Sequence, residues 1–368
     1  MRTSVAARLP EFPWDLLAPY AETARAHPDG VVDLSIGTPV DDVPAPLQAG
    51  LAAASNAPGY PQTYGTPQLR QAVSDWFARR RNTPGVDPAG VLPTIGSKEL
   101  VAWLPTLLGL GPDSTVVIPT VAYPTYDVGA RMAGARVVVA DATTALGPGP
   151  VDLVWVNTPS NPTGKVLGVE HLRKVVRWAR DRGALVASDE CYAQLGWDGI
   201  EVPSILDPRV CEGSAEGLLA VYSLSKQSNL AGYRAAFVAG DPAVVAELLA
   251  VRKHLGMMMP LPVQQAMTVA LADDAHVEEQ KARYLARRER LIPAVQAAGL
   301  RIESSEAGLY LWCTRDEDCW ATLDWLAGLG ILAAPGAFYG TAGRQYVRIA
   351  LTANDERIEE AVARLGRA

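Results

Sequence analysis

Short apolar runs alternate with amphipathic stretches from about residue 67 to residue 252 of this chain. The apolar runs read STVVIP, ARVVVA, VDLVWV, ALVAS, GLLAVY and RAAFVAG. Strands buried on both faces read as continuous apolar runs, whereas stretches such as PQLRQAVSDWFARRR and VEHLRKVVRWARDR have helical spacing. The alternation predicts an α/β fold in which helices cover both faces of a mostly parallel sheet.

The pattern changes after residue 260. Residues 262–298 are densely charged at helical spacing, which predicts a long linking helix with a solvated face. Pro293 is expected to kink or end this helix, because proline lacks the backbone N–H. Beyond it, short helical stretches alternate with the runs LRIESS, GLYLWC, GILAAP and YVRIAL. This second pattern predicts a smaller α+β domain.

One lysine follows directly on a strand-like run. Lys226 comes after GLLAVY, at the kind of strand end where open α/β sheets bind their ligands. A lysine amine is nucleophilic only when it is unprotonated, and burial or nearby positive charge lowers its pKa. Ser223, Ser225 and Arg234 can hold an anionic group, so the segment suits a phosphorylated aldehyde held as an imine. The alternative is a solvated loop lysine followed by an arginine that begins the next strand, since the motif is short.

Two further segments place polar residues after strands. Asp189 follows the apolar run LVAS, and an acid there can keep a heterocyclic nitrogen protonated, as pyridoxal phosphate requires of its partner. Asn161 lies in the rigid turn NTPSNPTGK. Asn161 and Tyr192 are able to stabilise a phenolate oxygen. Each residue alone also fits a helix cap or a turn, but right-handed crossovers place Asp189 and Lys226 on one rim of the sheet.

Together these segments resemble the fold-type I, class I/II aminotransferases, which use pyridoxal 5'-phosphate, and the resemblance covers nearly the whole chain. It implies that Lys226 is the Schiff-base lysine and that Asp189 pairs with the cofactor's pyridinium nitrogen. Asn161 and Tyr192 become donors to the ring oxygen. Ser223 and Arg234 are expected to hold the phosphate, assisted by Ser225.

The resemblance extends to other motifs. Gly96, Ser97 and Lys98 in TIGSKEL match the loop that offers backbone N–H groups to the phosphate at a helix start. The remaining matches are Tyr123 stacking on the cofactor ring, Arg348 and Gly37 binding the substrate α-carboxylate, and Tyr60 reaching the phosphate of a neighbouring subunit. Tyr60 thus implies a homodimer with shared sites. The alternatives are that Tyr123 only packs, that Arg348 only forms a salt bridge and that Tyr60 is a turn aromatic.

The resemblance also implies the domain organisation. Residues 1–32 are expected to pack on the small domain, residues 33–260 to form the large cofactor-binding domain, and residues 261–368 to form the small C-terminal domain. Lys226 then moves the substrate α-proton as base and acid in a ping-pong transfer between amino acids and 2-oxo acids.

Composition excludes several other classes. The net charge is −7, and a nucleic-acid surface needs basic patches that the chain does not show. The four cysteines lack C-x-x-C spacing and the four histidines lack a ligand pattern, so neither a disulfide framework nor a metal site is expected. The N-terminal sequence does not read as a secretory signal, and no apolar run is long enough to span a membrane. We therefore expect a cytoplasmic enzyme.

The substrate prediction depends on framework sequence. The runs LPEFPWDLLAPY, VLPTIGSKELVAWLPTLLGLGP and KHLGMMMPLPVQQA resemble actinobacterial N-succinyldiaminopimelate aminotransferases of lysine and diaminopimelate biosynthesis. A substrate with extra carboxylates calls for a cation at the mouth of the site, for which Lys98 and Arg25 are candidates. The alternatives are an aspartate or aromatic aminotransferase or a C–S lyase on the same scaffold. An effector-sensing module without catalysis is disfavoured, because the chain has no basic DNA-binding domain.

Overall fold

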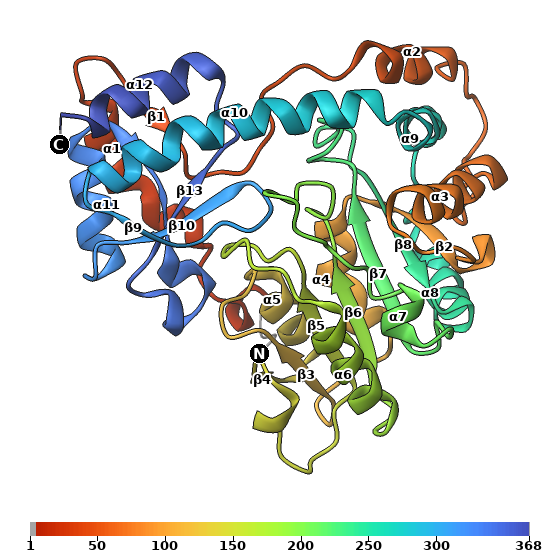
Figure 1. The fold of residues 1–368 in the computed structure, drawn as a ribbon. Coiled ribbons are helices and arrows are strands. Elements are labelled where there is room, and N and C mark those ends of the chain that lie inside the picture. Colours follow the sequence, from red (N-terminus) through yellow and green to blue (C-terminus); the bar gives the residue numbers. More distant parts are fainter. Residues whose placement is uncertain (1–4, 368) are drawn as a thin grey trace.

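The computed structural model describes residues 5–367. Figure 1 shows two lobes, and the larger is built around a seven-stranded sheet within the described residues. From edge to edge this sheet comprises β2 (Val91–Ile95), β8 (Ala235–Gly240), β7 (Leu218–Ser223), β6 (Leu185–Asp189), β5 (Leu153–Asn157), β3 (Thr115–Ile118) and β4 (Arg136–Val139). The strands from β7 to β4 are parallel, whereas β8 runs antiparallel to both β2 and β7. The predicted α/β fold with a mostly parallel sheet is confirmed.

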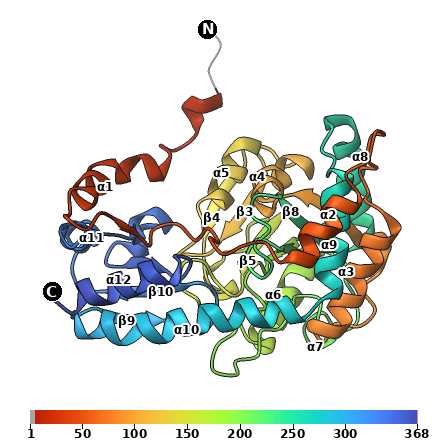
Figure 2. The same ribbon diagram turned by 90° about the horizontal axis from the view of Figure 1, so that it is seen from above.

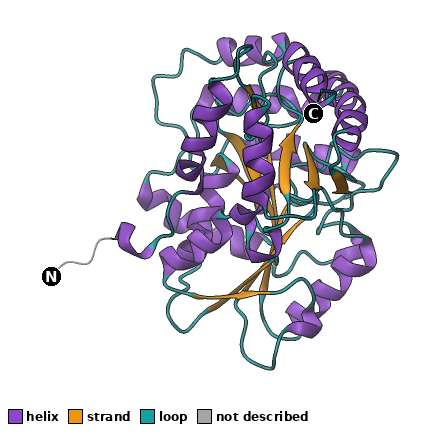
Figure 3. Ribbon diagram, turned by 90° about the vertical axis from the view of Figure 1, so that its left-hand side faces the viewer, coloured by secondary structure: helices purple, strands orange, loops and turns teal. Residues whose placement is uncertain are grey.

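Helices cover both faces of this sheet, as the continuous apolar strands require (Figure 3). All residues of β3, β5, β7 and β8 are buried. The helices of this lobe include α3 (Pro67–Arg80), α4 (Ser97–Leu107), α5 (Thr125–Ala133), α6 (Val169–Arg180) and α8 (Pro242–Leu255). The start of α3 is set by Thr66, whose hydroxyl oxygen accepts a hydrogen bond from the backbone N–H of Leu69 at 3.1 Å.

The smaller lobe contains a four-stranded antiparallel sheet in the order β12 (Ala334–Pro335), β13 (Val347–Ala350), β10 (Tyr310–Thr314) and β9 (Arg301–Ser304). α11 (Cys319–Gly328) and α12 (Asp355–Leu365) belong to the same lobe. The N-terminal helix α1 (Ala18–Arg25) packs on α11, and β1 (Val32–Asp33) pairs in parallel with β11 (Ile331–Leu332). Residues of the N-terminal segment and of the small lobe therefore share one apolar core.

The predicted long helix over residues 262–298 is two helices. α9 (Leu261–Ala272) ends before Asp273, and α10 (Ala275–Ala297) begins after Asp274. Of the two expectations for Pro293, the one that it ends the helix was wrong, and the one that it kinks the helix stays a prediction. Pro293 lies inside α10 but close to its end, where the missing N–H removes a single bond and four more residues follow.

The long helix α10 runs along both lobes (Figures 1 and 2). α9 packs against α2 (Ala45–Ala53) and α3 on the large-lobe side, whereas α10 packs against α12 on the small-lobe side. The boundaries at 32/33 and 260/261 stay a prediction, and residues 1–4 lie outside the described part of the chain.

The remaining elements are short and lie in the connections. They are α7 (Pro208–Cys211) and the 3₁₀ turns η1 (Val5–Arg8), η2 (Pro13–Leu17), η3 (Pro88–Gly90), η4 (Thr143–Ala145), η5 (Gly336–Tyr339) and η6 (Thr341–Gly343). Among residues 5–367, no helix combines the length and apolar character needed to cross a membrane.

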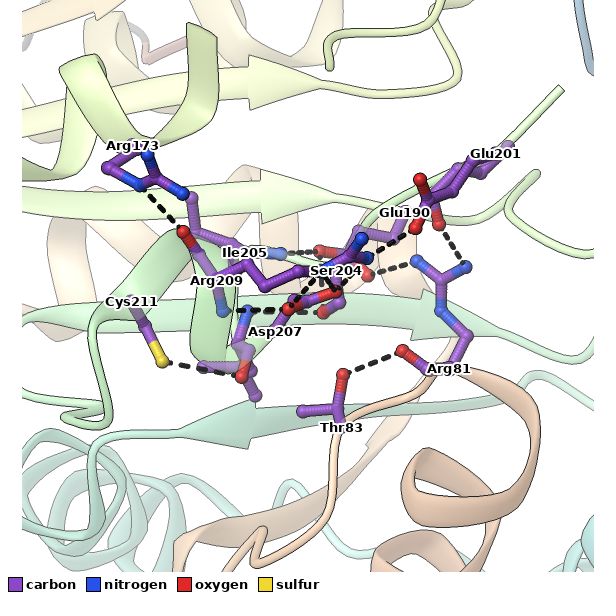
Figure 4. Close-up of polar contacts among 12 residues, drawn as sticks. Arg81, Thr83, Arg173, Glu190, Glu201, Ser204, Ile205, Asp207, Arg209 and Cys211 are labelled. Carbon is purple, nitrogen blue, oxygen red and sulfur yellow. Dashed lines mark hydrogen bonds and ion pairs between the residues drawn. The ribbon is translucent and has the colours of Figure 1, made fainter. Parts of the chain in front are cut away.

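A buried ion pair fixes the chain just beyond β6 (Figure 4). Arg81, at the end of α3, donates to Glu190 at 2.9 Å, and the two side chains are 2% and 1% exposed. Glu190 also accepts from the Ser204 hydroxyl at 3.1 Å and from the backbone N–H of Ile205 at 2.7 Å. A buried carboxylate is tolerated when its oxygens are this fully bonded. Glu190 directly follows Asp189, so the network holds the end of β6 in place.

We predict that Arg81→Met destabilises the protein by about 3–5 kcal/mol, because it leaves the buried Glu190 carboxylate without its counter-ion. Guanidinium unfolding of the apoprotein measures the change. The control is Arg290→Met, which removes the exposed pair between Arg290 and Glu359 and should leave the unfolding midpoint unchanged. Equal midpoints for the two variants would contradict the structural role of Arg81.

Candidate active site

A cavity of about 740 Å³ lies at the carboxyl ends of the parallel strands, where the two lobes meet. Residues from both lobes and from the N-terminal segment line it. It brings together twelve of the residues predicted from the sequence, namely Gly37, Ser97, Lys98, Tyr123, Asn161, Asp189, Tyr192, Ser223, Ser225, Lys226, Arg234 and Arg348. Because parallel strands end on one edge, separate sequence segments converge here.

Lys226 lies three residues after β7, and its ammonium group donates to the carbonyl oxygen of Gly37. Burial lowers the pKa of Lys226 below its ordinary value, and the charges of Arg348 and Arg234 act in the same direction. A lower pKa raises the fraction of unprotonated amine at neutral pH. The position therefore suits a nucleophile and a general base.

Asp189 ends β6 and is buried. Its Oδ2 accepts from the Tyr126 hydroxyl at 2.8 Å, and its Oδ1 accepts from the Cys191 backbone N–H at 3.2 Å. Burial raises the pKa of Asp189, although these hydrogen bonds oppose the change. Tyr126 is held in turn by stacking on Trp155, with ring centroids 4.8 Å apart.

Asn161 and Arg348 join the two lobes. The backbone N–H of Asn161 donates to Asn157 Oδ1 at 2.7 Å, and Asn157 Nδ2 donates to the Asp189 carbonyl at 2.9 Å. Arg348, on β13, donates to Asn161 Oδ1 at 2.8 Å and to the Ser35 carbonyl at 2.5 Å. Asn157 therefore ties the predicted turn to the end of β6.

The start of α4 faces the same cavity. Gly96 precedes the helix with φ of 82°, a left-handed conformation that favours glycine, and no side chain caps the first turn. A Cβ at Gly96 would collide with the guanidinium of Arg234, so glycine also allows this close approach. Ser223 and Ser225 line the same cavity, and the Ser223 hydroxyl donates to the Ser225 hydroxyl at 2.8 Å. Free N–H groups, an arginine and two hydroxyls form a site for a phosphate.

The comparisons with known proteins agree with this geometry. Residues 29–365 match the family model described as aminotransferase class I and II. The chain belongs to this family. Class I and II aminotransferases depend on pyridoxal phosphate, and their fold is the fold-type I architecture described above.

Two relatives are similar to this aminotransferase along almost the whole of its chain. A probable aminotransferase of Mycobacterium tuberculosis is 62% identical over 99% of this chain and 87% of its own length. The 4-dedimethylamino-4-oxo-anhydrotetracycline transaminase OxyQ of Streptomyces rimosus is 59% identical, over 97% of this chain and 99% of its own. Among solved structures, a probable N-succinyldiaminopimelate aminotransferase from Thermus thermophilus superposes with a TM-score of 0.87 at 29% identity, covering 97% of this chain and 100% of that one.

The residues of the cavity fit pyridoxal phosphate. Asp189 is a buried carboxylate that contacts no cationic side chain in the described part of the chain, and a protonated ring nitrogen would supply the missing charge. The uncapped start of α4 and Arg234 suit the phosphate group. The Nε of Arg348 is buried without a hydrogen-bond partner among residues 5–367, which a substrate carboxylate would provide.

The structure adds residues that the sequence patterns did not single out. Tyr310, in the run GLYLWC, lines the cavity, and its hydroxyl lies 3.0 Å from that of Tyr192. Tyr126 contacts Asp189, and residues 9–14 of the N-terminal segment cover part of the cavity. The run GLYLWC predicted only a strand, and apolar patterning could not indicate that its tyrosine faces the site.

Tyr60 lies away from these residues. Its side chain is 92% exposed and does not line the cavity of its own chain. This position leaves the side chain free for contact with a second subunit, so its predicted role stays a prediction. Among residues 5–367, no cluster of three or more His, Cys, Asp or Glu side chains is arranged to hold a metal ion.

We predict that Lys226→Ala abolishes both the visible absorbance band of the lysine-bound cofactor and turnover, since Lys98, the other lysine that lines the cavity, is exposed and lacks the burial that lowers the pKa of Lys226. Absorbance spectra and single-turnover kinetics check this. Lys253→Ala, an exposed lysine of α8, is the control and should keep both properties. Unchanged turnover in Lys226→Ala would overturn the assignment of Lys226.

Proposed function

We propose that this aminotransferase transfers the amino group between N-succinyl-LL-2,6-diaminopimelate and 2-oxoglutarate, a step of lysine and diaminopimelate biosynthesis. The main support for this proposal is that two cationic side chains line one cavity. Arg348 is buried, and Lys98 is exposed where α4 begins. A substrate with an α-carboxylate and a distant second acid engages both.

The surroundings of Lys98 support this assignment. Its Nζ lies 5.7 Å from the ring centroid of Phe12 in the N-terminal segment, and no carboxylate pairs with it in the described part of the chain. Arg25, the other candidate cation, does not line the cavity. The cavity volume is in the upper part of the range of roughly 300–1,000 Å³ for small-molecule sites, as a long substrate needs.

Each residue of the site has a defined role in this proposal. Bound pyridoxal phosphate supplies an electron sink for the bond broken at the substrate α-carbon. Lys226 Nζ takes the α-proton and returns it, which its lowered pKa favours. Arg348 holds the α-carboxylate with its free Nε and orients the α-hydrogen toward Lys226.

The other residues hold the cofactor in a fixed position and orientation. Asp189 anchors its ring nitrogen, and Asn161 and Tyr192 donate to its ring oxygen. Tyr123 packs against its ring. The pKa of Tyr123 is raised to about 12 by burial, so the hydroxyl remains protonated at neutral pH. Ser97 and Lys98 offer backbone N–H groups to the phosphate, together with Ser223, Ser225 and Arg234. The predicted N–H donor Gly96 instead donates to the Thr94 carbonyl at 2.8 Å, so its part is to allow the close approach of Arg234.

A second candidate substrate is a bulky aromatic oxo compound. Leu9, Pro10, Phe12, Trp14, Ile36 and Val128 give the cavity a mainly apolar wall. The relative at 59% identity, OxyQ, is named for a tetracycline intermediate. An apolar wall of this kind favours flat, apolar substrates over flexible polyanions.

The test between the two is a half-reaction screen. Holoenzyme is mixed with single amino donors, and loss of the visible band is followed. We expect loss with glutamate and with N-succinyl-LL-2,6-diaminopimelate. A response to phenylalanine or tyrosine without a response to the succinylated diamine would favour the second candidate. No response to any amino donor would overturn both.

The same assay with Lys98 variants tests whether Lys98 binds the distal acid of the succinylated substrate. Lys98→Ala should raise KM for the succinylated diamine by about tenfold or more, because a charge-assisted contact is lost, and should leave the cofactor band intact. Lys98→Arg should restore most of the affinity. Arg25→Ala is the matched control and should behave as wild type. An unaltered KM in Lys98→Ala would refute the distal role of Lys98.

We also propose a homodimer in which Tyr60 of each subunit contacts the phosphate in the other. Its exposure in one chain supports this placement. Tyr60→Phe removes only the hydroxyl and should raise the Kd for pyridoxal phosphate by about tenfold while the dimer persists. Cofactor titration and light scattering measure the two quantities. Normal cofactor affinity in this variant would leave the shared-site proposal unsupported.

A further inference from the structure

Tyr310 makes a polar contact inside the cavity that none of the roles above explains. The residue lies on β10, is buried, and belongs to the small lobe. Its hydroxyl oxygen is 3.0 Å from the hydroxyl oxygen of Tyr192, which follows β6 in the large lobe. The two rings meet edge to face, with centroids 5.6 Å apart. This hydrogen bond therefore crosses between the lobes at the site.

Two further contacts fix the Tyr310 ring. The guanidinium carbon of Arg348 lies 4.0 Å from its centroid, a cation–π arrangement. A Cβ on Gly37 would collide with the Tyr310 hydroxyl, so the hydroxyl sits directly against the Gly37 backbone. The carbonyl of Gly37 accepts from Lys226. Tyr310 thus contacts Arg348, Tyr192 and the backbone of Gly37, whose carbonyl accepts from Lys226.

The direction of the hydrogen bond follows from proton counting. A tyrosine hydroxyl carries one proton and accepts through its lone pairs. When Tyr192 donates its proton to the cofactor's ring oxygen, Tyr310 has to be the donor in the bond between the two tyrosines. We propose that Tyr310 is a positioning residue that orients the Tyr192 hydroxyl and strengthens it as a donor. This inference rests on the role of Tyr192 given under the proposed function.

The electrostatics agree with that direction. Burial alone would raise the pKa of Tyr310, but the charges of Arg348 on β13 and Lys226 after β7 bring it below its usual value. Burial raises the pKa of Tyr192, and Tyr310 raises it further. Two charged or titratable groups act on both hydroxyls: Arg348 lowers both pKa values and Cys191 raises both, while the net shift stays downward for Tyr310 and upward for Tyr192. The more acidic hydroxyl is the better hydrogen-bond donor. Tyr310 is therefore expected to donate its proton to the hydroxyl oxygen of Tyr192.

The chain offers a matched control in Tyr339. Its ring also lies under Arg348, with the guanidinium carbon 5.2 Å from the centroid, and its hydroxyl is buried. That hydroxyl has no hydrogen-bond partner among residues 5–367. Tyr310→Phe and Tyr339→Phe each keep the ring and its contact with Arg348. Only Tyr310→Phe removes a hydroxyl bonded to Tyr192.

The experiment follows the visible band of the lysine-bound cofactor against pH in the holoenzyme. A donor to the ring oxygen favours its anionic form and lowers the midpoint at which the linkage to Lys226 loses its proton. Tyr310→Phe should therefore raise this midpoint by about half a unit, and should lower kcat about tenfold while KM changes less than about twofold. Tyr339→Phe should match wild type in all three quantities. Thermal unfolding of the apoproteins checks that both variants fold.

Two outcomes would overturn the inference. One is a midpoint and kcat in Tyr310→Phe equal to those of wild type, and the other is an equal change in Tyr310→Phe and Tyr339→Phe. If Tyr310→Phe does not fold, a ring-fluorinated tyrosine at position 310 replaces it. This side chain is a more acidic donor, so it should move the midpoint to lower pH, and an unmoved midpoint counts against the inference.

A double variant separates this inference from the role of Tyr192. If Tyr310 acts through Tyr192, adding Tyr310→Phe to Tyr192→Phe should change the midpoint no further. Additive changes would overturn the proposed coupling. A normal midpoint in Tyr192→Phe alone would instead remove the assigned role of Tyr192. An altered midpoint in Tyr192→Phe together with a normal one in Tyr310→Phe would refute only the inference about Tyr310.

Discussion

A permanently charged guanidinium, buried where the two lobes meet, is the constraint on which the site depends. Arg348 is 3% exposed and cannot release its proton, so the surrounding structure has to supply its partners. Asn161 comes from the large lobe, the Ser35 carbonyl from the segment after β1, and the ring of Tyr310 from the small sheet. Hydrogen-bond and ring partners for this one buried cation thus come from three separate parts of the chain, which meet around the cavity.

The buried ion pair between Arg81 and Glu190 supports the end of β6 from outside the cavity. Glu190 is held by Arg81 and by the segment around Ser204 (Figure 4). The adjacent Asp189 lines the cavity and accepts from Tyr126. Neighbouring residues of an extended chain face opposite ways, so one carboxylate can anchor the chain and the next can serve the site. The position of Asp189 therefore depends on contacts far from the cofactor.

In the proposed function, reaction type and substrate choice reside in different parts of this molecule. The groups around Lys226 and Asp189, to which we assign the chemistry, come from strand ends of the large sheet. The wall proposed to meet the rest of the substrate comes instead from residues 9–14, from Lys98 and from the small lobe. A relative as similar as OxyQ carries the name of a different substrate from that of the Thermus structure, so likeness along the chain leaves substrate choice open.

The sequence by itself determined six of the seven strands of the large sheet, the order of the polar residues after them and the family, because continuous apolar runs and strand-end motifs are local features. The edge strand β2 was not among the predicted runs. The sequence did not reveal the break between α9 and α10, since the charge pattern continues across Asp273 and Asp274. Nor did it reveal the contact of Tyr310 with Tyr192, the support of Asp189 by Tyr126 or the pairing of Arg81 with Glu190. Each of these joins residues that lie far apart in the chain. Only the packing of the two lobes decided which of many apolar and charged side chains came to face the cavity.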